Sequence, residues 1–206
     1  MGEGFEIAEA VDGLLARIVD QHGVEAVMEY AIAECERRRL SLVWDELREL
    51  PYAEDPQRTA EWWRRLLATE PPPSEVNGYW FGIYYPCSDE TMSDVGAAFY
   101  VSGSRAWPEE GWAGDTWWWP ERRYPESPIM LDLYRRTESS GDDAVAFYGN
   151  CFLTLAYTGA TVVNLLGATS PNALLDGANE RVVACGHDSG DGHVIGTITQ
   201  SGIIWR

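Results

Sequence analysis

The chain has 206 residues, enough to bury a substantial core in one domain, and its 45% hydrophobic and 23% charged residues exclude a disordered chain. Its 33 acidic residues outnumber its 15 basic ones, so the formal net charge is −18. This charge excludes nucleic acid as a direct ligand, because neutralising phosphates needs a basic face, and it favours a basic protein partner.

The first third of the chain, residues 1–70, is predicted to form a helical N-terminal subdomain. Apolar residues recur there at intervals of three and four, which places them on one face of a helix. The pattern is carried first by Ile7, Val11, Leu14, Leu15 and Ile18, and then by Val24, Val27, Met28, Ala31, Ile32 and Cys35. Three successive prolines at 71–73 cannot continue a helix, so they mark the end of this segment.

Residues 77–206 are predicted to form an α+β sheet domain. Five short segments there are rich in β-branched and aromatic residues and are bounded by turn formers, as strands are. They are residues 77–86, 95–103, 181–188, 193–200 and 202–205. The predicted fold class is therefore α+β: N-terminal helices pack on an antiparallel sheet of about five strands, and the two parts form one continuous globular unit.

A long uncharged stretch lies between these strands. From Ala144 to Leu175 the chain carries no charge over 32 residues, more than the ~20 residues that a helix needs to span a bilayer. However, the stretch contains polar residues such as Asn150 and Asn164, and no basic residues flank it. We therefore predict a long buried helix at about residues 144–167 and no association with a membrane.

The most unusual segment is rich in tryptophan and lies between the second strand and the following helix. Three consecutive side chains cannot all face one core, so part of the Trp117–Trp119 triplet is expected to be exposed. Exposed aromatic rings beside charges are typical of binding surfaces. The predicted partner-binding residues are Trp112, Trp117, Trp118, Trp119, Tyr124, Glu109, Glu110, Asp115 and Glu121. Two alternatives stay open: the rings form a small core that pins the loop, or they stack on a sugar.

A second candidate site is the turn CGHDSGDGH, residues 185–193. If its two histidines end paired strands, they lie opposite each other, and Cys185 lies two residues back on the same face. Such a group is a candidate transition-metal or thiol–imidazole site, although its spacing matches no standard signature. The candidate ligands are Cys185, His187, His193, Asp188 and Asp191. The alternative, a metal-free polar turn, is the one we predict, and we expect no cofactor.

The cellular location is inferred from the N-terminal residues and the cysteines. The first ten residues lack the basic and apolar regions of an export signal, so we expect a cytoplasmic protein. The cysteines Cys35, Cys87, Cys151 and Cys185 are widely spaced, and we expect all four to be reduced thiols.

The functional hypothesis combines the acidic charge with the aromatic loop. Long-range attraction speeds the encounter with a basic partner, and aromatic anchors then hold it. We expect an acidic inhibitor or immunity-type protein that binds a basic partner such as a bacterial toxin. No nucleotide-binding, hydrolase or metalloprotease motif is present, so a non-enzymatic role is favoured. The alternatives are a small enzyme or metal-binding protein that uses residues 185–193, and a carbohydrate- or peptide-binding module that uses the Trp-rich loop.

Overall fold

The structure is a computed structural model, and it describes residues 3–20, 23–85, 96–109, 111–189 and 192–206. The predicted helical segment forms four α-helices. They are α1 (Glu3–Val19), α2 (Val24–Arg38), α3 (Val43–Arg48) and α4 (Asp55–Thr69). All six apolar residues that predicted the second helix are buried in α2, which confirms the spacing argument for this element.

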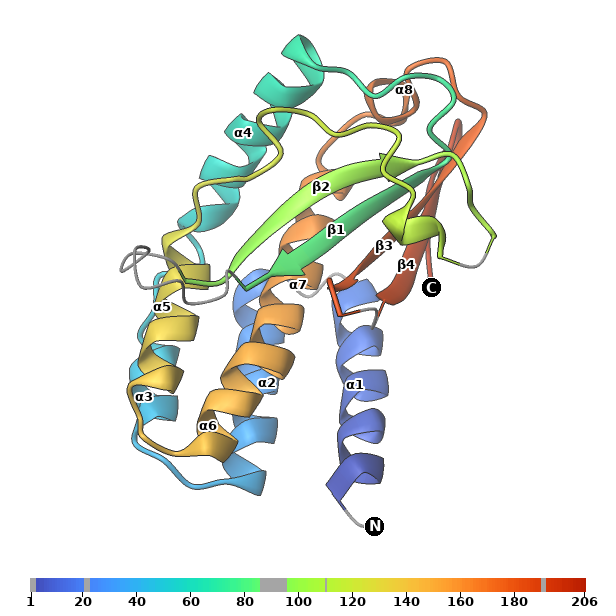
Figure 1. Ribbon diagram of the computed structural model, residues 1–206. Helices are drawn as coiled ribbons and strands as arrows, with labels where there is room; N and C mark the ends of the chain where they lie inside the picture. Colours follow the sequence, from blue (N-terminus) through green and yellow to red (C-terminus); the bar gives the residue numbers. More distant parts are fainter. Residues whose placement is uncertain (1–2, 21–22, 86–95, 110, 190–191) are drawn as a thin grey trace.

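Five described segments pair into one sheet. They are β1 (Gly78–Tyr84), β2 (Ala98–Ser104), β3 (Glu180–His187), β4 (Gly192–Thr199) and β5 (Gly202–Trp205). Their order across the sheet is β2-β1-β3-β4-β5. The α+β class is therefore confirmed, and helices lie along one side of the sheet (Figure 1).

The sheet differs from the prediction in one pairing. β1 and β3 run parallel, whereas the three other pairs are antiparallel, so the sheet is mixed. The prediction of an antiparallel sheet rested on hydrophobic period, which does not report strand direction, and more than ninety residues separate the end of β1 from the start of β3. A connection of that length permits a parallel crossover. As a result, the carboxyl ends of both strands meet at one edge, where Ile83 pairs with His187.

The long uncharged helix is present, but it is continuously buried only from Phe152 to Val163 and it is not a regular α-helix throughout. It consists of α6 (Asp143–Phe147), a π-helical segment η2 (Tyr148–Leu153) and α7 (Thr154–Gly167). It follows α5 (Pro128–Glu138) and precedes the short α8 (Pro171–Leu175). Nearly all of α7 is buried, and α7 packs against both the N-terminal helices and the sheet. Within the described ranges, no helix combines the length and apolar character needed to cross a membrane.

One hydrophobic core joins the two halves of the chain. It contains buried side chains from α1, α2 and α4, from the long helix, and from the inner face of the sheet. Side chains alternate along each strand, so Tyr79 and Phe81 of β1 face this core while Trp80 between them faces the opposite side. The outer face of the sheet therefore needs a second cover, and the Trp-rich loop provides part of it.

A buried carboxylate ties three helices together on the inner side. Asp55 at the start of α4 is only 3% exposed, and its Oδ2 accepts hydrogen bonds from Ser127 Oγ at 2.8 Å and from the Tyr157 hydroxyl. Ser127 is also the N-cap of α5, where its Oγ accepts from the backbone N–H of Met130. Burial raises the pKa of Asp55, although the Ser127 hydrogen bond and the charge of Arg58 act in the opposite direction.

We expect the wild-type protein to lose stability relative to Asp55→Asn as the pH rises. A carboxyl group whose pKa is raised by folding holds its proton more tightly in the folded state. Its contribution to the free energy of unfolding is therefore most favourable at and below its ordinary pKa of 3.8, and it is lost as the pH rises through the raised pKa. The asparagine oxygen can still accept from both hydroxyls without a buried charge. Urea unfolding of both proteins between about pH 4 and pH 7 measures this difference in unfolding free energy. A difference that is constant over this range contradicts the prediction.

Candidate functional site

The first part of the Trp-rich loop covers the outer face of the sheet. Trp80, Tyr100 and Ala184 form a small hydrophobic cluster there, and Trp112 of the short helix η1 (Trp112–Gly114) packs edge-on against Trp80 with ring centroids 6.3 Å apart. The indole of Trp112 lies directly over Gly78, where a Cβ atom would come within 2.7 Å of the ring. Glycine at this position therefore lets the loop lie close against the strand.

The Trp117–Trp119 triplet follows the free edge of β2 like a short extra strand. Backbone hydrogen bonds connect Gly103 with Trp118 in both directions at 2.9 Å. The side chains then alternate as on a pleated strand. Trp118 is buried beside Tyr79 on the core side, and its indole N–H donates to the Glu70 carbonyl at 3.1 Å. Trp119 points the other way and packs on Tyr100 with centroids 5.2 Å apart. The edge of β2 is thus covered, and the triplet is divided between core and surface.

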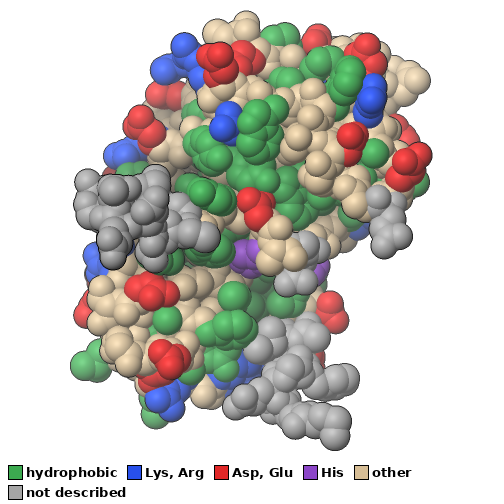
Figure 2. Space-filling model, in the orientation of Figure 1, with side chains coloured by type: hydrophobic (Ala, Val, Ile, Leu, Met, Phe, Trp, Pro, Cys, Tyr) green, Lys and Arg blue, Asp and Glu red, His purple; other side chains and the backbone are tan. Residues whose placement is uncertain are grey.

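Three rings of this loop remain about half exposed: Trp117 at 46%, Trp119 at 45% and Tyr124 at 40%. Each is stacked with an arginine. The Arg105 guanidinium lies 3.9 Å from the Trp117 ring centroid, and that of Arg123 lies 4.3 Å from Trp119 and 4.8 Å from Tyr124. Such cation–π contacts hold the rings in place while leaving their edges accessible. Figure 2 shows hydrophobic side chains gathered over this upper part of the molecule.

The acidic residues predicted beside these rings are placed less uniformly. Glu109 and Glu121 are exposed, and the backbone N–H of Glu121 donates to Glu70 Oε2 at 2.6 Å. Asp115 is half-buried and lies 3.4 Å from Ser104 Oγ. Glu110 lies outside the described residues. The charges stacked on the exposed rings are thus guanidinium groups, with the carboxylates around them.

The turn at residues 185–193 differs from its predicted register. His193 on β4 pairs with Cys185 on β3 and not with His187. All three side chains still lie on one face of the sheet, because His193 is directly opposite Cys185 and His187 is two residues further along β3. Cys185 is fully buried, and burial raises its pKa to about 12, which disfavours the thiolate that binds metals. Asp188 points to the other face and accepts a hydrogen bond from the Tyr100 hydroxyl at 2.7 Å. Asp191 lies outside the described residues. In the part of the chain that the structure describes, no three His, Cys, Asp or Glu side chains are grouped to hold a metal ion.

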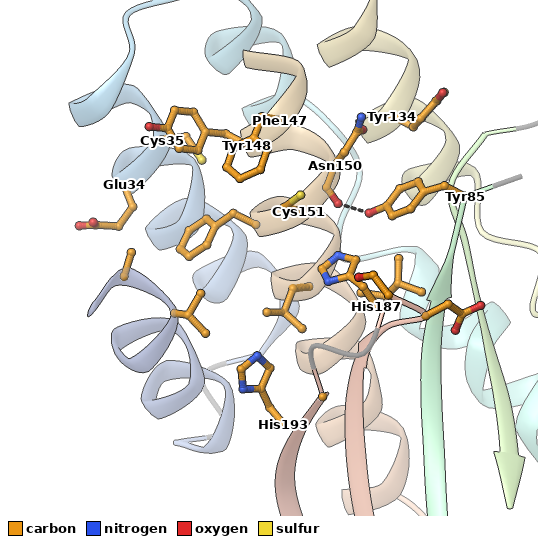
Figure 3. Close-up of a pocket in the computed structure, with 18 of the residues that line it drawn as sticks. Glu34, Cys35, Tyr85, Tyr134, Phe147, Tyr148, Asn150, Cys151, His187 and His193 are labelled. Atoms are coloured by element: carbon orange, nitrogen blue, oxygen red, sulfur yellow. Dashed lines mark hydrogen bonds between the residues drawn. The ribbon is translucent and has the colours of Figure 1, made fainter. Parts of the chain in front are cut away.

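The two histidines instead line a cavity of about 1030 Å³, which we call the waist pocket. It lies where the carboxyl ends of β1 and β3 meet helices α1, α2 and η2. Figure 2 shows histidine side chains reaching the surface at the waist between the sheet half and the helical half of the molecule. Figure 3 shows Cys151 and His187 pointing into the cavity from η2 and from the end of β3. Sequence reasoning identified the histidines but missed Tyr85, Asn150 and Cys151.

The π-helical segment has a local cause at this pocket. The backbone carbonyl of Asn150 accepts hydrogen bonds from the Tyr85 hydroxyl and from Thr154 Oγ1, which divert it from the regular helical pattern. His187 stacks on Tyr85 with ring centroids 5.9 Å apart, and its Nε2 lies 3.4 Å from Thr154 Oγ1. Burial raises the pKa of Tyr85, and the neighbouring Cys151 adds to that effect. π-helical turns inside α-helices occur frequently at functional sites.

The described cysteines should differ sharply in reactivity. Cys35 and Cys185 are buried, whereas Cys151 is half-buried; Cys35 and Cys151 both line the waist pocket. Burial also raises the pKa of Cys35. We expect N-ethylmaleimide to modify Cys151 well before the two buried thiols in the native protein, because Cys151 is half-buried whereas Cys35 and Cys185 have almost no exposed surface. Peptide mass spectrometry of a Cys87→Ser variant measures each rate, and equal rates at all three sites contradict this expectation.

Comparison with models of known protein families, with curated protein sequences and with solved structures finds no match for this chain.

Proposed function

We propose that this chain is a cytoplasmic inhibitor or immunity-type protein that binds a basic protein partner, such as a bacterial toxin domain, at the edge of β2. The binding surface consists of Trp117, Trp119 and Tyr124 with the acidic residues around them. The observation that carries the proposal is that these rings are about half exposed although they belong to a loop whose backbone is fixed to the sheet. We call this surface the aromatic edge.

Preorganisation supports a binding role for the aromatic edge. Association costs less free energy when the contacting side chains are already ordered, and Trp and Tyr in fixed positions are frequent interface hot spots. Trp118 anchors the loop in the core, and Arg105 and Arg123 restrain the exposed rings. Because each guanidinium occupies one face of its ring, the edges of the rings are the better contact surface. Stacking on a sugar is correspondingly disfavoured.

Charge supports a basic partner. The net charge of −18 attracts a cationic protein from a distance and raises the association rate. The loop itself, residues 105–126, contains five acidic residues and three arginines. The carboxylates of Glu109 and Glu121 are exposed around the rings, where they can pair with lysine or arginine side chains of the partner.

The test uses the product of the neighbouring gene, which the proposal expects to be a basic protein, with binding measured by surface plasmon resonance. Trp119→Ala should weaken binding roughly 30-fold, the effect of about 2 kcal/mol at a hot spot. Ile204→Ala serves as the control, because Ile204 is an exposed apolar residue on β5, at the opposite end of the sheet order. Glu121→Arg should chiefly slow association, and this effect should shrink as salt is added.

Three results would count against the proposal. The first is that the neighbouring gene product does not bind. The second is that Trp119→Ala binds as tightly as the wild type, which would place the interface elsewhere. The third is that binding weakens only in proportion to a loss of thermal stability, which would make the aromatic edge a structural mini-core.

A further inference from the structure

The waist pocket lies apart from the aromatic edge and has the dimensions of a ligand site. Its volume of about 1030 Å³ is at the upper end of the ~300–1,000 Å³ that is typical of small-molecule sites. The parallel pairing of β1 and β3 brings Tyr84 and Tyr85 beside His187 at its base. Crevices at the carboxyl ends of parallel strands are frequent binding sites in open α/β sheets, and the β1–β3 pair provides one such edge here.

Aromatic rings form much of the pocket wall. They come from the end of β1, from α5 and from the long helix, and they belong to Tyr84, Tyr85, Tyr134, Phe147, Tyr148 and Phe152. The ring centroids of Tyr85 and Tyr134 are 6.2 Å apart, and those of Phe147 and Tyr148 are 5.9 Å apart, so the rings form two groups on different elements. Phe147 is 46% exposed, which leaves aromatic surface available to a ligand.

The charges around the pocket are unfavourable to an anion. Arg38 is the lining arginine, and its Nη1 donates both to Glu34 Oε2 at 2.5 Å and to the Glu34 carbonyl at 2.9 Å. Its guanidinium is therefore already engaged with a carboxylate. Asp12 and Asp188 also line the pocket; Asp12 is exposed, and the Asp188 carboxylate is turned to the outer face of the sheet, where it accepts from the Tyr100 hydroxyl. Among the residues that line the cavity, Asp12, Glu34 and Asp188 carry carboxylates and Arg38 carries a guanidinium, and Glu34 Oε2 is shared between Arg38 and Arg37.

We propose that the waist pocket binds an organic cation with an apolar body, such as an alkyl- or arylammonium compound. The negative faces of the aromatic rings attract a cation, and the surrounding carboxylates and the charge of −18 raise its local concentration. The apolar part of the ligand is buried against Phe152 and Leu155. An anion of the same size contacts the same apolar surface but is repelled by these negative charges, so it should bind more weakly.

Three probes of matched size separate charge from hydrophobicity: phenethylammonium, 2-phenylethanol and phenylacetate. Saturation-transfer NMR on the full chain at low salt should rank their affinities in that order. Phe147→Leu keeps an apolar side chain but removes the ring, so it should weaken the cation about 2- to 5-fold and leave the alcohol nearly unchanged. Ile204→Ala is again the control, and thermal melts verify that each variant is folded.

A second measurement locates the bound probe. In the Cys87→Ser variant, phenethylammonium should slow the modification of Cys151 by N-ethylmaleimide, whereas phenylacetate at the same concentration should not. The proposal is overturned if phenylacetate binds as tightly as the cation. It is also overturned if millimolar phenethylammonium does not bind, or if it binds without protecting Cys151.

Discussion

Arg181→Met should be among the most destabilising single substitutions in this protein, with an expected loss of about 3–5 kcal/mol in unfolding free energy. Arg181 in β3 is fully buried. Its guanidinium donates to the backbone carbonyls of Val76, Leu174, Pro72 and Pro73, and to the Tyr79 hydroxyl. These acceptors belong to the proline segment 71–73, to the residues that lead into β1 and to β1 itself, and to the end of α8. Methionine fills similar space but removes the donors to the Val76 and Pro72 carbonyls, whereas the Leu174 and Pro73 carbonyls keep the Tyr79 hydroxyl and the Val76 N–H as donors.

The expected loss corresponds to a fall in melting temperature of roughly 10 °C for a chain of this length. Arg181→Lys keeps the charge but cannot donate in a planar fork to carbonyls on several sides, so its effect should be intermediate. The control is Arg64→Met on the exposed face of α4, which should change stability by no more than about 0.5 kcal/mol. If the Arg181→Met and Arg64→Met variants have the same melting temperature, the buried hydrogen bonds of Arg181 do not stabilise the contact between β3 and the proline segment 71–73.

The change in hydrophobic period at residues 71–73 was sufficient to predict an α+β chain, because period is a local property. Arg181 was not predictable in the same way. In the sequence it is one of fifteen basic residues, and its burial depends on five acceptors contributed by segments up to 109 residues away. The parallel pairing of β1 and β3 depends equally on distant segments, since no turn connects the two strands directly.

The waist pocket shows the same contrast between features that local sequence indicates and features that depend on distant segments. His187 could be identified because two histidines bracket one short turn, but Tyr85 and Cys151 reach the site from a different strand and from the long helix. One local signal was present: Gly149 and Asn150 interrupt an otherwise apolar helical pattern. The structure explains both residues. A Cβ at position 149 would come within 2.2 Å of Thr137 on α5, and the side-chain amide of Asn150 donates to Glu138 Oε1 on α5 at 2.5 Å.

Trp118→Ala should cost about 3–5 kcal/mol, as large-to-small substitutions in a core do. Its indole is 6% exposed, packs 6.0 Å from the Tyr79 ring and donates to the Glu70 carbonyl. Alanine leaves a cavity beside Tyr79 and removes the donor to that carbonyl. Trp117→Ala is the matched control one residue away; that ring is 46% exposed, so the cost should stay below about 1 kcal/mol. Urea unfolding measures both losses.

Hydrogen exchange shows whether Trp118 also holds the aromatic edge in place. The Gly103 and Val101 N–H groups donate to the carbonyls of Trp118 and Arg123, so both amides should exchange faster in Trp118→Ala and at the wild-type rate in Trp117→Ala. Equal destabilisation by the two substitutions would contradict the strand-like alternation of the triplet. With the expected difference, Trp118 acts as the structural anchor, and the neighbouring rings can be altered to test binding without unfolding the protein.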